Sequence, residues 1–291
     1  MINIKRSLEK NNGYWFIAPQ MILVLLFIII PVFKGFQMSA FSKYGRKEVF
    51  VGFDNFKFLF EDPIFRQAIV NTIFFIVAIV VVTIVFALFV STTVFDKNSK
   101  YLGLIRTSYY LPVMVSMIVM SVIWKMLLNP ANGVITWLLE IVGFEGMNLL
   151  GNPNTVMPVI VFVTFVGNVG QAILIYLATM IGIPKDYFEA ADLDGASRWA
   201  KIRHIIIPLV KPTTLYLIIT NIVAVLEIFV VIQQLTGGGP NNASVTMMYY
   251  LYQNAFVYNR SGVSAAIGVL MFVIALVLSI PQMKSYLKGD K

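Results

Sequence analysis

The sequence predicts an all-α membrane protein with six transmembrane helices, and its composition is the first reason. Of its 291 residues, 58% are hydrophobic and only 12% are charged, whereas about 25% are charged in an average soluble domain. The second reason is the presence of six apolar stretches, each long enough to cross a hydrocarbon core, which takes roughly 20 helical residues. Their length and scarcity of charge favour helices over barrel strands, which need only about 9 to 11 residues. We therefore expect a single membrane domain over residues 1–291.

The predicted spans are Trp15–Phe36, Ile69–Phe95, Thr107–Leu128, Val156–Ile183, Thr213–Leu235 and Gly262–Met283. A secretory signal also has a basic start and an apolar run, but that run is usually about 7 to 15 residues long and ends at a small-residue cleavage site. The first stretch here is longer, contains Pro19 and Pro31, and lacks such a site. It is interpreted as a permanent span.

The distribution of Lys and Arg among the loops sets the expected orientation, because basic residues near span ends are retained in the cytoplasm. Most of the 22 basic residues lie in the two termini, in the loop after the second span and in residues 184–212. Both termini and residues 184–212 are thus expected in the cytoplasm, and residues 37–68 and 236–261 are expected to be extracellular loops. The net charge of +8 then reflects topology and attraction to anionic lipid, and indicates no nucleic-acid partner.

The two predicted outer loops differ in character. In the first, Phe53, Phe56, Leu59 and Phe60 recur at helical spacing, which predicts a short amphipathic helix that is a packing element or lies at the interface. The second begins with the breaker cluster TGGGPNN, which must end the fifth span sharply. Its three glycines permit conformations that side chains would block. Both a simple turn and a docking or gating element remain open for Gly237, Gly238, Gly239 and Pro240.

Residues 184–212 stand out as a charged segment between two apolar runs, and they predict two short helices along the membrane face. Pro184 begins the first helix, Asp186 is its expected N-cap, and Gly195 ends it. The second helix runs from Ser197 until Pro208 redirects the chain toward the next span. Small and charged side chains alternate on this segment, which suits a docking surface for another protein. They are Glu189, Ala190, Ala191, Asp194 and Arg198.

Polar residues inside the apolar spans mark a candidate solute path, because such groups are costly in lipid and usually face a cavity or a partner. Glu227 lies in the fifth span, with Asn221 and Gln233 on the same predicted helix. Asn168 and Gln171 are the equivalent residues of the fourth span. Glu227 either lines a cavity, where it would bind sugar hydroxyls or a cationic group, or makes a structural hydrogen bond to a neighbouring helix.

The chain has few of the residue types that catalysis and metal binding usually require. The sequence contains no Cys and one His, so thiolate catalysis, disulfides and metal sites are not expected. No G-x-x-x-x-G-K-[ST] phosphate loop occurs in the sequence. A secondary, ion-coupled transporter is the alternative reading, but it should show paired or inverted halves with broken helices.

Within the charged segment, one motif resembles the EAA loop of binding-protein-dependent ABC importer permeases. It consists of Glu189, Ala190, Ala191, Gly195, Ile205 and Pro208. Three further stretches are similar to the sugar-type permeases, in particular the maltose-transporter F chain and the glycerol-phosphate-transporter A chain. These stretches are GFDNFKFLFEDPIFRQAIVNT at 52–72, NPANGVITWLLEIVG at 129–143 and LTGGGPNNASVTMMYYLYQNAF at 235–256.

The resemblance implies a type I ABC importer permease fold and a subunit that is not itself an enzyme. Such a subunit imports a carbohydrate or sugar-like solute into a prokaryotic cell together with a homologous second permease. Two cytoplasmic ATPase subunits, which bind ATP and Mg, and an extracellular solute-binding protein complete the complex, so this chain needs no cofactor of its own. Which sugar is carried, and which permease holds its main site, stays open.

The resemblance also implies roles for individual residues. Glu189 is the expected ionic contact to the ATPase, Ala190 and Ala191 its close-packed face, and Gly195 the turn, while Gly237–Pro240 is the candidate docking site for the binding protein. One departure concerns the fourth span, where many relatives carry a Trp near Val166. This chain has Gly167 and Gly170 nearby, which leave more room for a solute or allow tighter helix packing.

Overall fold

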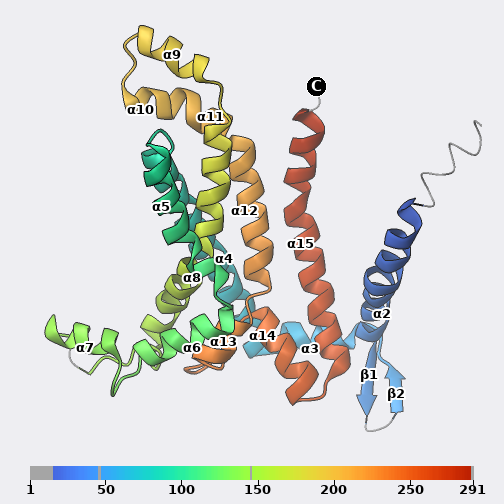
Figure 1. Ribbon diagram of the computed structural model, residues 1–291. Helices are drawn as coiled ribbons and strands as arrows, with labels where there is room; N and C mark the ends of the chain where they lie inside the picture. The colour runs from blue at the N-terminus through green and yellow to red at the C-terminus, as the bar shows by residue number, and fades with distance from the viewer. Residues whose placement is uncertain (1–15, 45–46, 145, 290–291) are drawn as a thin grey trace, which may run out of the picture. The chain divides into compact units, whose positions relative to one another are not determined.

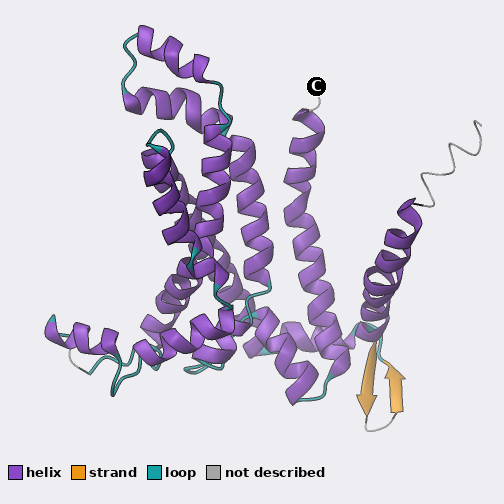
Figure 2. Ribbon diagram, in the orientation of Figure 1, coloured by secondary structure: helices purple, strands orange, loops and turns teal. Residues whose placement is uncertain are grey.

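The computed structural model describes residues 16–44, 47–144 and 146–289, and Figure 1 labels its helices and strands. Within these described residues, four helices are long and apolar enough to cross a membrane, or up to six if each of two bent helix pairs counts as one span. Figure 2 shows that helices make up nearly all of the described elements, with one pair of strands among them. The predicted all-α membrane fold is therefore confirmed. Trp15 and the basic N-terminus lie outside the described residues.

By its contacts the chain divides into two compact units. The first contains the described residues up to Glu61 together with Leu251–Leu270. Its N-terminal span covers Phe16–Ser39 and includes a π-helical segment. The elements of this unit are η1 (Leu25–Ile29), α2 (Ile30–Ser39), β1 (Phe41–Tyr44), β2 (Lys47–Phe50), α3 (Asp54–Glu61), η4 (Gln253–Val257) and the first part of α15 (Ser261–Gly289).

A polar side chain organises the first unit at the end of its N-terminal span. The buried Asn55 of α3 donates hydrogen bonds to the carbonyls of Ser39 (2.8 Å) and Phe41 (2.9 Å). Strands β1 and β2 pair antiparallel, with Phe41 opposite Phe50, and were not predicted. Helix α3 was predicted as an amphipathic helix and is confirmed, with Leu59 fully buried.

The second unit contains Asp62–Tyr250 and the chain from Met271 onward. Its helices are α4 (Pro63–Val94), α5 (Ser99–Tyr110), η2 (Pro112–Met114), α6 (Met117–Leu127), α7 (Val134–Ile141), α8 (Pro153–Ile181), α9 (Lys185–Leu193), α10 (Arg198–Lys201), η3 (Ile202–Ile206), α11 (Ile207–Leu209), α12 (Lys211–Leu226), α13 (Val230–Leu235) and most of α14 (Met247–Tyr252).

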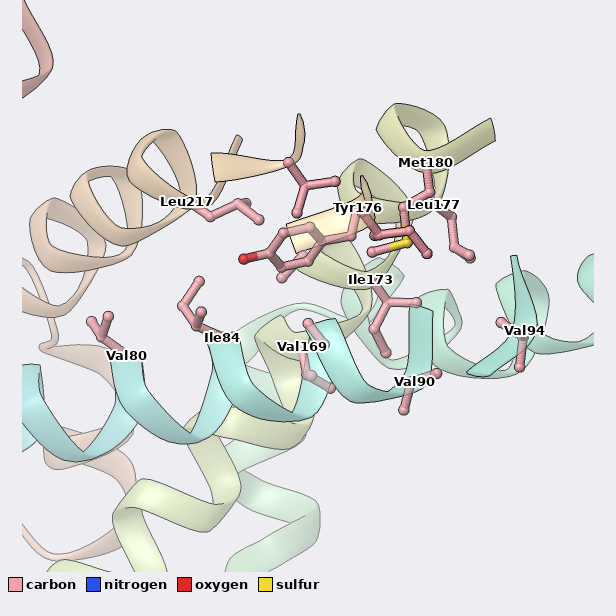
Figure 3. Close-up of a cluster of buried hydrophobic side chains, with 14 residues drawn as sticks. Val80, Ile84, Val90, Val94, Val169, Ile173, Tyr176, Leu177, Met180 and Leu217 are labelled. Carbon is pink, nitrogen blue, oxygen red and sulfur yellow. The ribbon is translucent and has the colours of Figure 1, made fainter. Parts of the chain in front are cut away.

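Helices α4 and α8 form the centre of this unit. Each begins with a proline after a capping side chain, since Asp62 accepts from the Ile64 N–H (2.8 Å) and Asn152 from the Asn154 N–H (2.9 Å). Figure 3 shows the apolar cluster between them, in which Tyr176 of α8 lies among side chains from α4 and α12. The Tyr176 hydroxyl donates to the Thr214 hydroxyl (2.9 Å), so the buried ring keeps a polar partner.

Two predicted spans are interrupted rather than continuous. The third is a pair of helices, residues 100–114 and 117–127, that meet at 93°. Pro112 opens the short 3-10 turn at this break, because proline lacks the N–H that the helix needs. The fifth, predicted as Thr213–Leu235, is broken at Glu227, because α12 ends at Leu226 and α13 begins at Val230. A 62° bend between Leu209 and Lys211 precedes this predicted span. A helix running unbroken to Leu235 was therefore a wrong expectation.

Candidate coupling hairpin and solute cavity

The segment predicted to contact an ATPase forms a hairpin of α9 and α10, which we call the coupling hairpin. In Figure 1 it lies at the top of the view, beyond the upper ends of α5 and α12. Gly195 connects the two helices with φ of +69°, a left-handed conformation that glycine adopts readily. The Ser197 side chain accepts from the Ala200 N–H (3.3 Å) and caps α10. The predicted end at Gly195 and start at Ser197 are confirmed.

The predicted cap of α9 is wrong. Pro184 occupies the N-cap position, and no side chain caps this helix. Asp186 lies instead in the first turn, where its carboxylate still interacts favourably with the positive end of the helix dipole. Pro208 is exposed within α11, one turn before the bend into α12.

The coupling hairpin presents both charged and apolar side chains to its surroundings. Glu189, Ala190 and Asp194 are exposed, and Ala191 is half-buried. Sequence reasoning singled these out but missed two large apolar residues beside them, Leu193 (91% exposed) and Trp199 (66% exposed). Their apolar character within a charged loop was the available signal. Isolated apolar side chains are common on surfaces, but exposed aromatic side chains such as Trp199 are enriched at protein interfaces.

Arg198 anchors the coupling hairpin to α4. Its guanidinium donates to the carbonyls of Thr92 (3.2 Å) and Thr93 (2.9 Å) and pairs with the carboxylate of Asp96 (3.2 Å). Lys201, in contrast, pairs with Asp192 inside the hairpin. Between the hairpin and the ends of α4 and α8 lies a cavity of about 700 Å³ with an apolar floor and a charged rim.

Three of the predicted solute-path residues meet at one cavity. Asn168 of α8, Asn221 of α12 and Glu227 line a cavity of about 190 Å³, together with Thr164, which the sequence reasoning missed. The side-chain NH₂ groups of both asparagines bond back to their own helices, Asn168 to Thr164 O and Asn221 to Leu217 O (both 2.8 Å).

Glu227 occupies the break between α12 and α13 rather than a helix interior. Its side chain is exposed at the cavity, and among the described residues it makes no hydrogen bond or ion pair. The predicted alternative of a structural bond to a neighbouring helix therefore has no partner within the described chain. Gln171 is exposed and Gln233 half-buried, and neither lines this cavity.

Gly167 and Gly170 allow tight packing of α8 against the broken third span. A Cβ at Gly170 would lie 1.9 Å from the carbonyl oxygen of Tyr109, and one at Gly167 would lie 2.9 Å from Cε of Met117. Of the two readings left open by the sequence, the structure favours close helix packing over extra room for a solute. Side chains larger than hydrogen at these two positions would collide with the third span.

The glycine-rich loop after α13 is held by internal hydrogen bonds. Gly237 and Gly238 both have positive φ, +59° and +85°, and the Gly239 carbonyl accepts from the Ser244 hydroxyl (2.7 Å). A Cβ at Gly238 would come within 2.7 Å of the Val245 side chain. Gly239 and Pro240 are half-buried, whereas Gly237 is exposed. The positive φ values and these hydrogen bonds fix the conformation of the loop.

Comparisons with known proteins give a consistent result. The chain is 32% identical to the probable ABC transporter permease protein YurN of Bacillus subtilis (strain 168), and the match covers 97% of this chain and 98% of that protein. It is 29% identical to the lactose transport system permease protein LacF of Rhizobium radiobacter, over 96% of this chain and 95% of LacF.

A solved structure shares the fold. One chain of a bacterial ABC transporter involved in the import of the acidic polysaccharide alginate superposes with a TM-score of 0.87 at 24% identity, covering 99% of this chain and 100% of that one. The chain therefore has the type I importer permease fold that the sequence implied. Residues 97–282 match the description "Binding-protein-dependent transport system inner membrane component". This chain belongs to that family of membrane transport components.

Proposed function

We propose that this chain is the permease subunit of an ATP-driven ABC importer that carries a carbohydrate or sugar-like solute into the cell. The observation that carries the proposal is the coupling hairpin, whose EAA motif and exposed Leu193 and Trp199 fit a surface that docks onto another protein. LacF is named for lactose transport, and the solved relative imports alginate. Both names support a solute rich in hydroxyl groups.

The proposal divides the work among several subunits. Cytoplasmic ATPases hold ATP and Mg²⁺ and contact the hairpin through Glu189, Ala190, Ala191 and Asp194. A homologous permease completes the pathway, and an extracellular solute-binding protein docks at Gly237–Pro240. Both termini and the coupling hairpin then face the cytoplasm of a prokaryotic cell, as the distribution of basic residues predicts.

The solute passes the cavity at Glu227, where the carboxylate accepts hydrogen bonds from solute hydroxyls or pairs with a cationic group. A helix break at this depth exposes backbone groups that bind polar ligands, provided that they line a cavity rather than lipid. Asn168 and Asn221 supply side-chain carbonyl oxygens on the neighbouring helices.

The Glu227→Gln substitution is expected to lower the initial rate of solute uptake about fivefold to tenfold. Glutamine keeps an accepting oxygen but loses the charge, and a hydrogen bond to a charged group contributes about 1.5–3 kcal/mol against about 0.5–1.5 kcal/mol for a neutral one. Labelled solute taken up by vesicles containing the assembled complex measures this rate. Glu140→Gln, the same change on the exposed surface of α7, is the control. Equal uptake by both variants would remove Glu227 from the path.

The energy source separates the proposed importer from an ion-coupled transporter. Vesicles with the full complex, ATP on the ATPase side and a panel of labelled mono- and oligosaccharides should take up a sugar only when ATP is hydrolysed. Dissipating ion gradients with ionophores should leave this uptake unchanged. Uptake that needs a gradient and ignores ATP would overturn the importer assignment.

A further inference from the structure

One end of α4 is bound to the coupling hairpin, and the opposite half of α4 is bound to the segment that follows the glycine-rich loop. The helix spans 32 residues from Pro63 to Val94, which corresponds to a length of about 48 Å at 1.5 Å per residue. It has neither Gly nor Pro after Pro63, whereas α8 contains both and the third and fifth spans are bent. Helix α4 is thus the most rigid connection across this unit, since kinks arise mostly at Pro and Gly.

At the hairpin end, Arg198 caps α4. The carbonyls of Thr92 and Thr93 belong to the last turn, where a helix leaves its acceptors without N–H partners. The Arg198 guanidinium donates hydrogen bonds to both carbonyls, and its positive charge interacts favourably with the negative end of the helix dipole. A second contact comes from α9, where the Phe188 ring packs on Phe95 at 5.7 Å between centroids. Both helices of the coupling hairpin therefore contact the C-terminal end of α4.

In the opposite half of α4, about two turns after Pro63, two side chains bind the segment that follows the glycine-rich loop. The buried Asn71 donates to the carbonyls of Asn242 (3.2 Å) and Val245 (2.9 Å). The neighbouring Thr72 hydroxyl accepts from the Met247 N–H (3.0 Å). The bonds to Val245 and Met247 are buried, so breaking either one leaves a buried polar group without a partner.

From this segment, one more bond reaches the solute cavity. The Thr246 hydroxyl, fully buried, donates to the carbonyl of Ile228 (3.0 Å). Ile228 follows Glu227 in the helix break. The bond from Thr246 therefore gives the Ile228 carbonyl a hydrogen-bond partner at the point where the helix is interrupted. A continuous set of bonds therefore runs from Arg198 through α4 to Thr72, then to Thr246 and the backbone beside Glu227.

We infer that α4 is a rigid link through which movement of the coupling hairpin is transmitted to the helix break at Glu227, with Arg198 as the positioning residue at one end and Thr72 as the positioning residue in the opposite half. The inference rests on the proposed function, because it requires an ATPase to move the hairpin. The inference also changes the role of Arg198. The sequence placed this residue on the docking surface for another protein, whereas in the structure its side chain is bound to α4.

The first test is Arg198→Gln in the assembled complex, with Lys201→Gln as control. Both changes remove one positive charge from α10, but only Arg198 bonds to α4, since Lys201 pairs inside the hairpin. Arg198→Gln is expected to retain the ATPase and its ATP hydrolysis while solute taken up per ATP falls at least tenfold. Lys201→Gln should stay within twofold of the wild type, and Arg198→Lys should recover part of the loss. An Arg198→Gln complex that transports as efficiently as Lys201→Gln overturns the link.

The second test addresses the opposite half of α4 with two substitutions of equal shape. Thr72→Val removes the acceptor of the Met247 N–H, whereas Thr83→Val removes a buried hydroxyl that has no partner among the described residues. Uptake per ATP is expected to fall for Thr72→Val and to be unchanged for Thr83→Val.

Combining Arg198→Gln with Thr72→Val tests whether the two contacts act in series. A shared link predicts that the double variant is no worse than the poorer single variant, whereas a loss equal to the product of the single losses overturns the link. The wild-type complex separates this inference from the proposed function. Uptake without ATP overturns the importer itself, but ATP-driven uptake that is insensitive to Arg198→Gln overturns only the rigid link.

Discussion

Glu189→Lys is expected to abolish solute uptake and to release the ATPase subunit from the purified complex. Glu189 is exposed on α9, and among the described residues it makes no hydrogen bond or ion pair, so its charge is available to a partner. Reversing it places a cation where the ATPase is proposed to supply one, and like charges across an interface strongly disfavour association. Uptake by cells and co-purification of the ATPase with tagged permease measure the two effects.

Two further variants make the Glu189 experiment specific. Glu140→Lys, the same charge reversal on the exposed surface of α7, should leave both uptake and co-purification intact. Glu189→Gln removes the charge without reversing it, so an intermediate loss is expected. Normal uptake by Glu189→Lys with the ATPase still bound would exclude this residue from the docking surface and reopen the ion-coupled alternative.

Gly170→Ala is expected to destabilise the protein by at least about 1–3 kcal/mol, the usual cost of overpacking. The added Cβ would lie 1.9 Å from the carbonyl oxygen of Tyr109 and 3.0 Å from the Val113 side chain. A backbone oxygen cannot rotate away, so α8 and the bend of the third span must separate. The thermal midpoint of unfolding in detergent should fall by several degrees, and uptake should fall with it.

Gly103→Ala is the matched control for Gly170→Ala. Gly103 lies in α5, and no atom comes within 4 Å of a Cβ built there. Alanine should be tolerated or should stabilise the helix by about 0.5–1 kcal/mol, since it loses less conformational freedom on folding than glycine. If both variants unfold at the same temperature, the close approach between α8 and Tyr109 contributes nothing to stability.

The number and placement of the spans followed from composition, because apolar runs of sufficient length have few alternatives in a membrane. Their interruptions divide into two kinds. Pro112 could have indicated the break in the third span, but an argument from hydropathy alone does not take it into account. The break at Glu227 has neither Gly nor Pro nearby. It is stabilised by the bond from Thr246 to Ile228, a contact that only tertiary structure reveals.

The candidate site shows the same division. Gly195 and Ser197 act on their immediate neighbours, so the ends of the hairpin helices could be predicted. Arg198 bonds to Thr93, which lies 105 positions earlier in the chain, and no local sequence pattern predicts this contact. Asn221 and Glu227, which the sequence placed on one helix, line the same cavity where α12 ends. Helical periodicity could not place Gln233 once the chain changed direction after Leu226.

The exposure of Leu193 and Trp199 has a consequence for copies of the protein that have not yet assembled with a partner. If the coupling hairpin faces the cytoplasm and binds an ATPase, as proposed, a copy without its ATPase exposes these two apolar side chains there, and exposed apolar surface promotes aggregation. Surplus copies then become substrates for chaperones and for proteolysis of orphan subunits. Cells that make this chain in excess of its ATPase should therefore degrade the surplus, and supply of the ATPase alone should restore its abundance.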